Sequence, residues 1–293
     1  MKAIKPIIYD CDNTMGLRFK EIDDGLTLLY LLGRPDIQLL GVTTTFGNGT
    51  ADQAYAQTKE LLRRVNRIDI PVWKGQAAPG DRPNQAAGFL ARLVTEQPGE
   101  VSVLATGPLT NLKAAAHTDA GFFRNLREIV CMGGYLQPLR IGWRNLAELN
   151  LCTDPHAAHA VLNAPCPVTL MSAQLCRQVF FGWGDLLIMR ALDPWIRKII
   201  RNWLLAFGLY CGVGRFYLWD LVPAVYLSYP DLFDGKKVCV TSTEKELTTG
   251  KISSRNFVNS GGHVFLPTRI RDVERLKKIV YEGWTGSCRS IKR

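Results

Sequence analysis

The 293-residue chain has few histidines, no paired-cysteine motif and no long apolar run, and these absences exclude several classes of protein. Its four histidines and eight cysteines are scattered, without the spacing of a zinc site. The cysteines therefore indicate buried thiols in a reducing compartment. No segment approaches the roughly 18 uninterrupted apolar residues of a membrane span, and an acidic pair interrupts the apolar N-terminal stretch before a signal-peptide core could form. We expect a cytoplasmic protein without a membrane partner.

The overall composition is that of an ordinary globular protein, with 47% hydrophobic and 21% charged residues. Disorder, collagen and coiled coil are excluded. The net charge is 36 − 26 = +10, which could favour nucleic acid, an anionic membrane surface or phosphorylated substrates, and composition does not choose between them. Because no linker, repeat or low-complexity segment is present, we expect one domain over residues 1–293.

Short β-branched runs alternate with helical patterns along most of the chain. Strands are expected at residues 5–9, 37–44, 68–73, 101–105, 128–132 and 168–171, and helices at 23–32, 51–65, 109–117 and 154–162. A helical insertion around residues 185–215, with a long helix at 185–209, interrupts the alternation. A helix at 216–227, a strand near 237–240, a hairpin to residue 265 and a closing helix at 272–281 are expected to follow. The pattern predicts an α/β fold with a doubly wound, mostly parallel open sheet and helices on both faces.

Carboxylates gather where the first strand should end. Asp10 and Asp12 are two residues apart on a strand and so share one face, while Asp23 and Asp24 begin the next helix. Each aspartate alone could be a turn former or a helix cap. Together they would repel one another, and a bound cation would relieve that repulsion. Oxygen ligands favour calcium or magnesium over zinc.

Two families resemble this segment. Residues 10–14, DCDNT, resemble the first motif of haloacid-dehalogenase-like phosphatases. The wider segment resembles the start of inosine-uridine-preferring nucleoside hydrolases, with their DxDxGxDD signature stretched by a loop at residues 15–21. Further matches to the second family follow in its order: TTTFGN at 43–48, ATGPLTNL at 105–112, MGG at 132–134, AELN at 147–150 and DP at 154–155. Several collinear motifs are more specific than one, and the chain is identified as resembling the nucleoside hydrolases.

The resemblance implies a role for each polar residue of these motifs. It implies Ca²⁺ held by Asp12, Asp24, the Thr106 carbonyl and Asp220, with Asp12 also acting as the base that accepts a proton from water. Asp10 would orient these ligands as a supporting residue. The positions that match ribose-binding residues are Asp23, Asn48, Glu148 and Asn150, and without the resemblance the last two could be plain surface polar residues.

The chain departs from the family pattern in three places. Many members carry His-Asp where this chain has Trp219-Asp220, and none of His117, His156, His159 and His263 can be placed there. Trp219 resembles the purine-preferring branch, in which an indole stacks on the base, although a core tryptophan is the alternative. A sugar-binding asparagine of the family is replaced by Gly142, with Asn145 nearby but out of register. Trp73 and Trp143 could form a second aromatic wall or pack elsewhere, and the insertion could be a lid or an oligomer contact.

The predicted function is therefore a calcium-dependent nucleoside N-ribohydrolase that releases a free base and ribose, with a purine preference. The expected partners are a small nucleoside and further copies of the chain in a homodimer or homotetramer, without nucleic acid. Two alternatives stay open. One is a magnesium-dependent phosphatase with Asp10 as its nucleophile, and the other is a non-catalytic nucleoside or nucleic-acid binder that uses the +10 charge.

Overall fold

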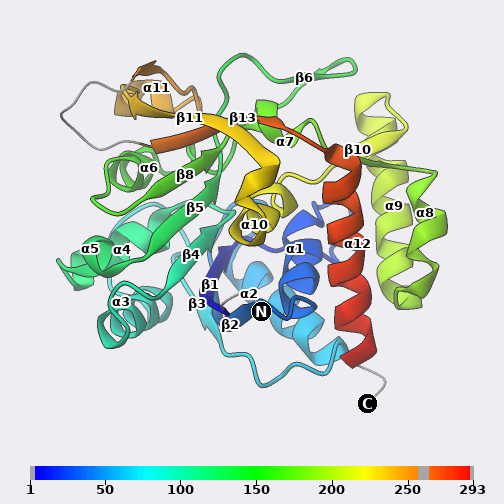
Figure 1. Cartoon of the computed structure of the whole chain (residues 1–293), viewed down its shortest axis with the longest axis horizontal. Helices are drawn as coiled ribbons and strands as arrows, with labels where there is room; N and C mark the ends of the chain where they lie inside the picture. Colours follow the sequence, from blue (N-terminus) through cyan, green and yellow to red (C-terminus); the bar gives the residue numbers. More distant parts are fainter. Residues whose placement is uncertain (1–3, 257–263, 291–293) are drawn as a thin grey trace.

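A nine-stranded sheet forms the centre of the computed structural model, which describes residues 4–256 and 264–290 (Figure 1). In spatial order, the parallel strands are β13 (Val264–Ile270), β8 (Val168–Met171), β5 (Glu128–Met132), β4 (Ser102–Ala105), β1 (Lys5–Cys11), β2 (Ile37–Thr44) and β3 (Val72–Lys74). β11 (Phe233–Val240) and β12 (Ser254–Asn256) extend the β13 edge in antiparallel pairing. The predicted mostly parallel α/β sheet is confirmed.

Helices cover both faces of the sheet, and the alternation of side chains along β1 shows why. Ile7 and Tyr9 pack into one hydrophobic cluster and Ile8 into the other, because successive strand residues point to opposite faces. The first cluster contains residues of α1 (Asp23–Leu32), α2 (Ala51–Arg64), α9 (Pro194–Cys211), α10 (Leu221–Ser228) and α12 (Val273–Ser290). The second contains residues of α3 (Gln85–Glu96), α4 (Thr110–Thr118), α5 (Phe122–Asn125) and α6 (Pro155–Leu162).

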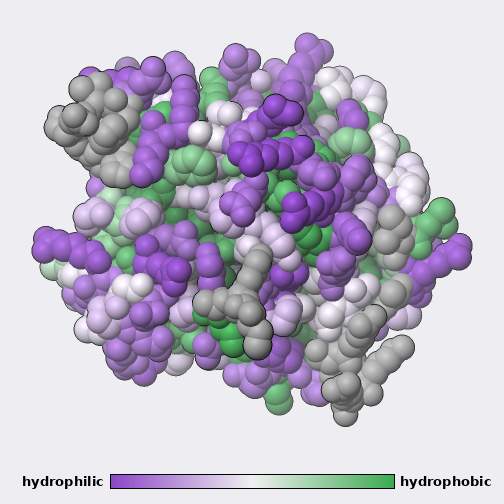
Figure 2. Space-filling view, in the orientation of Figure 1, coloured by the Kyte–Doolittle hydropathy of each residue, from purple (hydrophilic) through white to green (hydrophobic). Residues whose placement is uncertain are grey.

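The face of the molecule in Figure 2 is largely hydrophilic, as expected when the apolar side chains lie between the layers. No helix within residues 4–256 and 264–290 combines the length and apolarity needed to cross a membrane. The remaining short elements are α7 (Ala173–Cys176), α8 (Asp185–Ile188), α11 (Glu244–Leu247), the 3₁₀ turns Met189–Ala191 and Pro230–Leu232, and the strand pairs β6 (Arg140–Ile141) with β7 (Arg144–Asn145) and β9 (Phe180–Gly182) with β10 (Arg215–Tyr217).

Some predicted elements are wrong, and local chemistry explains part of the difference. The continuous helix predicted at residues 185–209 is broken, because Asp193 caps a new helix that starts at Pro194 and ends at Gly212 with φ +71°. The helix predicted at 216–227 is a strand, β10, followed by α10. The strand predicted at 68–73 begins only at Val72, and α3 has no counterpart among the predicted elements.

The strand order places a topological switch beside β1. β2 lies on one side of β1 and β4 on the other, so the loops that leave the carboxyl ends of β1 and β4 diverge. In open α/β sheets, ligands bind in the crevice at such a point. The carboxylates predicted from the sequence lie at this crevice.

Candidate active site

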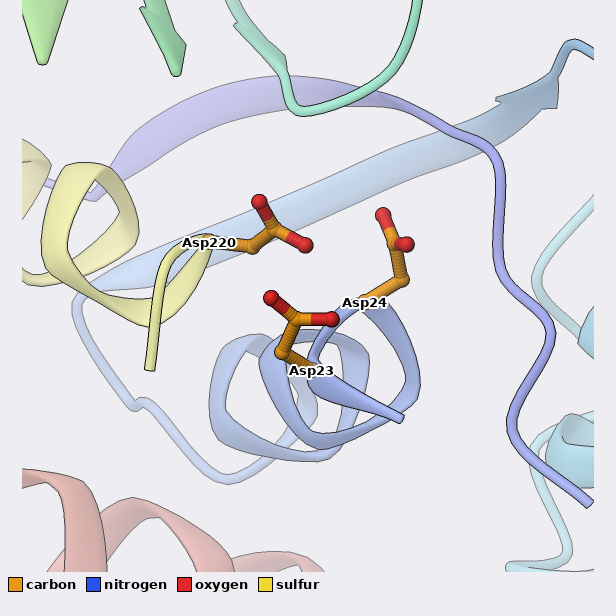
Figure 3. A group of neighbouring side chains, drawn as sticks. All are labelled: Asp23, Asp24 and Asp220. Atoms are coloured by element: carbon orange, nitrogen blue, oxygen red, sulfur yellow. The ribbon is translucent and has the colours of Figure 1, made fainter. Parts of the chain in front are cut away.

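Four buried aspartates form what we call the acidic cluster: Asp12, Asp23, Asp24 and Asp220. Asp12 follows β1, Asp23 and Asp24 open α1, and Asp220 lies directly before α10. Figure 3 shows the carboxylates of Asp23, Asp24 and Asp220 turned toward one another, with an oxygen of each within 4.8 Å of the others. All four side chains are at most 4% exposed. Segments far apart in the sequence thus bring four acids to one place.

Burial and mutual repulsion disfavour negative charge throughout the acidic cluster. Burial raises the pKa of Asp12 well above its usual range, and the neighbouring Asp24 raises it further. For Asp220, burial is again the main cause of a raised pKa, followed by Asp23 and Asp24. A cation between these carboxylates would offset the repulsion between them.

The groups around the acidic cluster fit a hard divalent cation. Buried Asp23 Oδ1 has no hydrogen-bond partner, so it is available as a ligand. Asp24 Oδ1 accepts hydrogen bonds from Tyr9 Oη at 3.1 Å and Thr106 Oγ1 at 2.8 Å. The Thr106 carbonyl accepts one from Asn150 Nδ2 at 2.8 Å, which leaves its second lone pair free. The donor set consists of oxygens, which Ca²⁺ and Mg²⁺ prefer.

Asp10 lies behind the acidic cluster and is fully buried. Its Oδ1 accepts hydrogen bonds from the Thr43 hydroxyl at 2.5 Å and from Asn111 Nδ2 at 2.8 Å. Burial raises its pKa to about 7, although both hydrogen bonds lower it. Asp10 does not line the neighbouring cavity, and its Oδ1 is already engaged by Thr43 and Asn111. This position favours a supporting role over that of a phosphatase nucleophile.

A cavity of about 410 Å³ lies over the acidic cluster at the carboxyl ends of the strands. Seven residues singled out in the sequence line it: Asp23, Asn48, Thr106, Glu148, Asn150, Trp219 and Asp220. Asp12 and Asp24 are not part of this lining, but each is hydrogen-bonded to a residue that is. Thr106 Oγ1 donates to Asp24 Oδ1 at 2.8 Å. Asp12 Oδ2 accepts a hydrogen bond from the Asn48 backbone N–H at 2.5 Å. The cavity is therefore polar at the end that faces the carboxylates.

Aromatic side chains from α9 and from the segment before α10 form part of the same cavity wall. Trp219 is 8% exposed, and its ring lies 5.0 Å from that of Tyr217. Trp203, Phe207 and Tyr210 of α9 also line the cavity. Residues of the insertion therefore form part of the cavity wall.

Trp73 and Trp143 pack outside the cavity, which was the alternative to a second aromatic wall. Trp73 stacks on Phe89 at 5.5 Å, because β3 faces α3 there. Trp143 is 64% exposed and donates its indole N–H to the Tyr210 carbonyl at 3.0 Å. Neither tryptophan lines the cavity. Gly142 and Asn145 do not line it either. Neither of them therefore replaces the sugar-binding asparagine that the family carries at the position of Gly142.

Sequence reasoning missed Phe19, Lys20 and Glu21, which line the cavity from the lengthened loop at residues 15–21. Lys20 Nζ donates to the Asn48 carbonyl at 2.6 Å, and burial, followed by Asp24, raises the pKa of Glu21 to about 7. The stretched signature was the available signal, since an insertion between two site motifs must lie near the site. His117, His156 and His159 are not in the lining, and His263 lies outside the described residues.

Comparison with known proteins identifies the family. The family description "inosine-uridine preferring nucleoside hydrolase" matches residues 7–278. The chain belongs to this family. Among relatives of this nucleoside hydrolase, uridine nucleosidase 1 of Arabidopsis thaliana is 30% identical over 265 residues, which cover 78% of this chain and 77% of that protein. The pyrimidine-specific ribonucleoside hydrolase RihA of Shewanella oneidensis is 29% identical over 84% of this chain and 85% of its own.

Solved structures agree on the fold of this nucleoside hydrolase. The purine-preferring ribonucleoside hydrolase from Gardnerella vaginalis superposes with a TM-score of 0.85 at 20% identity and covers 97% of this chain and 99% of that one. A plant nucleoside hydrolase gives a TM-score of 0.83 at 23% identity and covers 96% and 99%. The predicted nucleoside hydrolase fold is confirmed, and the protein is a hydrolase that acts on N-glycosyl compounds.

Proposed function

We propose that the protein is a calcium-dependent nucleoside N-ribohydrolase that releases a free base and ribose. The observation that carries the proposal is one cavity whose wall combines carboxylates and amides with aromatic rings. A nucleoside has matching parts, a polyol joined to a flat heterocycle. Polar contacts to the polyol and stacking on the heterocycle would together orient the glycosidic bond.

The polar part of the cavity wall offers the donors and acceptors that ribose hydroxyls need. Asn150 Nδ2 donates to the Thr106 and Met132 carbonyls, at 2.8 and 3.1 Å, so its Oδ1 would be the atom that accepts from a substrate hydroxyl. Asp23 keeps Oδ1 without a partner. One ribose hydroxyl can donate to each of these two oxygens, and a hydroxyl that donates can still accept a hydrogen bond from Asn48. The supporting contacts fix these side chains before the substrate arrives.

Asp12, Asp24, Asp220 and the Thr106 carbonyl would hold Ca²⁺, and an oxygen of Asp23 lies within 4.8 Å of an oxygen of both Asp24 and Asp220. When bound, the ion would supply a positive centre that binds ribose hydroxyls and lowers the pKa of water. The four acids repel one another without such a charge, which supports a resident cation. The preference for calcium over magnesium is part of the proposal.

In the proposed reaction, the bond between the sugar C1′ and the base nitrogen breaks, and its electron pair leaves with the base. The water oxygen bonds to C1′, and the Asp12 carboxylate accepts the proton that the water loses. The Asn48 N–H on Asp12 Oδ2 holds this carboxylate in place. The departing base takes up a proton from solvent while Asp12 returns its proton to solvent, and stacking on Trp219 supports the departure of the base.

The aromatic wall underlies the proposed purine preference. Base stacking on an aromatic side chain contributes roughly 1–3 kcal/mol, and a purine covers more of an indole than a pyrimidine does. The relatives named above include a uridine nucleosidase and a pyrimidine-specific hydrolase, so inosine and uridine are the substrates to compare. We also expect a cytoplasmic homodimer or homotetramer in which residues 1–293 act as one domain, which sedimentation and limited proteolysis can test.

The test is reducing-sugar release from inosine, adenosine, guanosine, uridine and cytidine, with p-nitrophenyl phosphate and RNA binding as the two comparison assays. We expect ribose release with inosine ahead of uridine, without phosphate release. Phosphate release together with dependence on Asp10 would support the phosphatase alternative. RNA binding with a steep salt dependence and no sugar release would support the binder.

A further inference from the structure

Glu148 lines the cavity, and several backbone N–H groups hold its carboxylate in place. Its side chain is 6% exposed, and both carboxylate oxygens accept the Leu151 N–H, at 3.1 and 3.0 Å. Oε2 also accepts the Cys152 N–H at 3.1 Å. These bonds fix the carboxylate from the chain segment that follows it. A different part of the chain packs against the opposite side of the Glu148 side chain.

Gly250 closes that other side. A Cβ atom at this position would lie 2.5 Å from Glu148 Oε2 and 2.6 Å from Glu148 Cβ, closer than side chains approach one another. Gly250 also has φ +78°, a conformation that glycine adopts readily. Its carbonyl accepts the Tyr135 N–H at 2.8 Å, and the Tyr135 carbonyl accepts the Ile252 N–H at 2.9 Å. The Gly250 backbone is thus fastened to the segment that follows β5.

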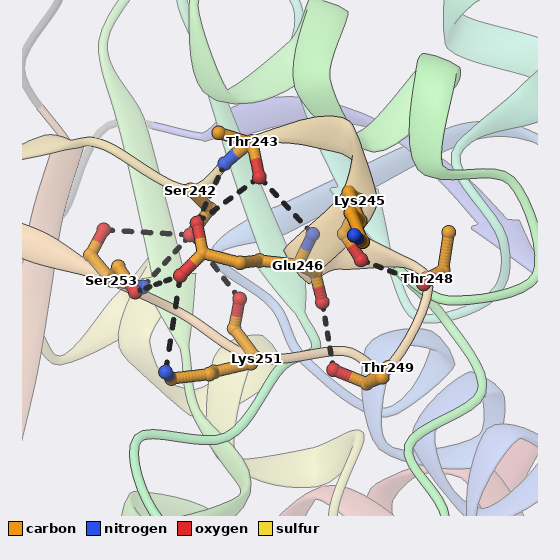
Figure 4. A network of polar contacts seen from close by, with 8 residues as sticks. All are labelled: Ser242, Thr243, Lys245, Glu246, Thr248, Thr249, Lys251 and Ser253. Atoms are coloured by element: carbon orange, nitrogen blue, oxygen red, sulfur yellow. Dashed lines mark hydrogen bonds and ion pairs between the residues drawn. The ribbon is translucent and has the colours of Figure 1, made fainter.

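A polar network holds the turn that carries Gly250, and Figure 4 shows its side chains gathered around Glu246. The Glu246 carboxylate accepts the Thr243 N–H at 2.9 Å and the Ser253 hydroxyl at 2.8 Å. Lys251 Nζ lies 3.9 Å from it. Ser242 and Ser253 join the two ends of the segment, with Ser253 N donating to Ser242 Oγ at 2.8 Å. This network lies outside the cavity, so substrate contact does not explain it.

We infer that Gly250 is a positioning residue, and that the segment Ser242–Ser253 holds the Glu148 carboxylate against its backbone donors so that it meets one ribose hydroxyl. The inference rests on the proposed function. It assigns a sugar-recognition task to a segment that follows the last family motif and supplies no cavity-lining residue. The carboxylate lies between the Leu151 and Cys152 amides on one side and bare backbone on the other. Glu148 also lines the cavity, where a ribose hydroxyl could meet its carboxylate.

The test compares Gly250→Ala with Gly99→Ala. Gly99 has the same φ of +78° but no atom within 4 Å of an added Cβ, so both variants carry similar backbone strain and only one displaces Glu148. The substrates are inosine and its 2′-, 3′- and 5′-deoxy analogues, measured as kcat/KM, with Glu148→Gln as the reference variant. Circular dichroism and the melting temperature check that each variant folds.

We expect Gly250→Ala to lose at least tenfold in kcat/KM on inosine and Gly99→Ala to stay within twofold of the parent. The loss should fall to within twofold on the same deoxy analogue on which Glu148→Gln also has its smallest effect. A merely structural role would lower kcat/KM equally on all four substrates, and that result would overturn the inference. So would a Gly250→Ala variant as active as Gly99→Ala.

If Gly250→Ala does not fold, Glu246→Gln takes its place, because it loosens the turn from outside the cavity. It should reproduce the hydroxyl dependence of Glu148→Gln with a smaller loss, and an equal loss on all substrates would overturn the inference. Failure of the proposed function looks different. In that case, the parent protein itself would release no sugar from inosine or uridine.

Discussion

Replacement of Trp219 by alanine should impair purine nucleosides more than pyrimidine nucleosides. The indole lines the cavity, so a base bound there could stack on it, and the Tyr217 ring packs against it with the ring centres 5.0 Å apart. Base stacking of roughly 1–3 kcal/mol corresponds to about 5- to 150-fold in kcat/KM. Inosine should lose a factor in this range and uridine a smaller one, since a single ring covers less of the indole.

The assay is ribose release from inosine and uridine at substrate concentrations below KM, for the parent and the variant. Trp219→Phe is a milder second variant, because truncation of a buried tryptophan to alanine costs roughly 3–5 kcal/mol of stability. It should lose less than the alanine variant on inosine. Trp143→Ala is the matched control, since Trp143 is 64% exposed and does not line the cavity. Equal losses on inosine and uridine would refute the stacking role.

Three further predictions concern Asp12 as the general base, the metal and the stability of the fold. Asp12→Ala should lose at least about 100-fold in turnover, in line with removal of a general base, while its circular dichroism spectrum stays that of the parent; turnover within tenfold of the parent would contradict its role. The raised pKa values in the acidic cluster mean that the folded, metal-free protein binds more protons than the unfolded chain above about pH 4, so its stability should fall as the pH rises. Calcium would replace those protons, and the melting-temperature gap between calcium-loaded and chelated protein should widen from pH 5 to 8, whereas a constant gap would argue against metal binding by these acids. Asp185→Ala should cost about 3 kcal/mol in urea denaturation, because it leaves the largely buried Lys277 without its partner at 2.6 Å; Asp234→Ala, which breaks the exposed pair with Arg271, should change stability much less, and similar losses would show that burial does not set the cost.

The sequence was sufficient where local signals and tertiary packing agree. Helix α1 and strands β2, β5 and β8 have the predicted bounds, because each combines a clear apolar pattern with a marked end. Predictions failed where a distant partner decides the conformation. Phe216 lies in a strand because β10 pairs with β9, although the sequence around it resembles a helix. Helix α3 was missed although Asn84 caps it, since Gly88 and the preceding Pro-rich and Gly-rich run obscured the pattern.

The candidate site divides in the same way. The family motifs located the aspartates, Asn48, Glu148 and Asn150, and Asp12 and Asn48 also follow strands whose carboxyl ends the pattern places at one edge of the sheet. Periodicity could not place Trp203 and Phe207 in the cavity, since they reach it from a helix more than 150 residues away from Asn48 in sequence. It also could not show that Gly250 backs Glu148. Such contacts depend on how loops of different length close over the sheet.

The most direct test of the central claim is a calcium titration of chelator-treated protein, followed by ribose release from inosine. Our account predicts negligible release after chelation and recovery that saturates as calcium fills the site, with Asp220→Asn shifting the titration to higher calcium. Full ribose release by the chelated protein, with calcium shown to be absent, would contradict it.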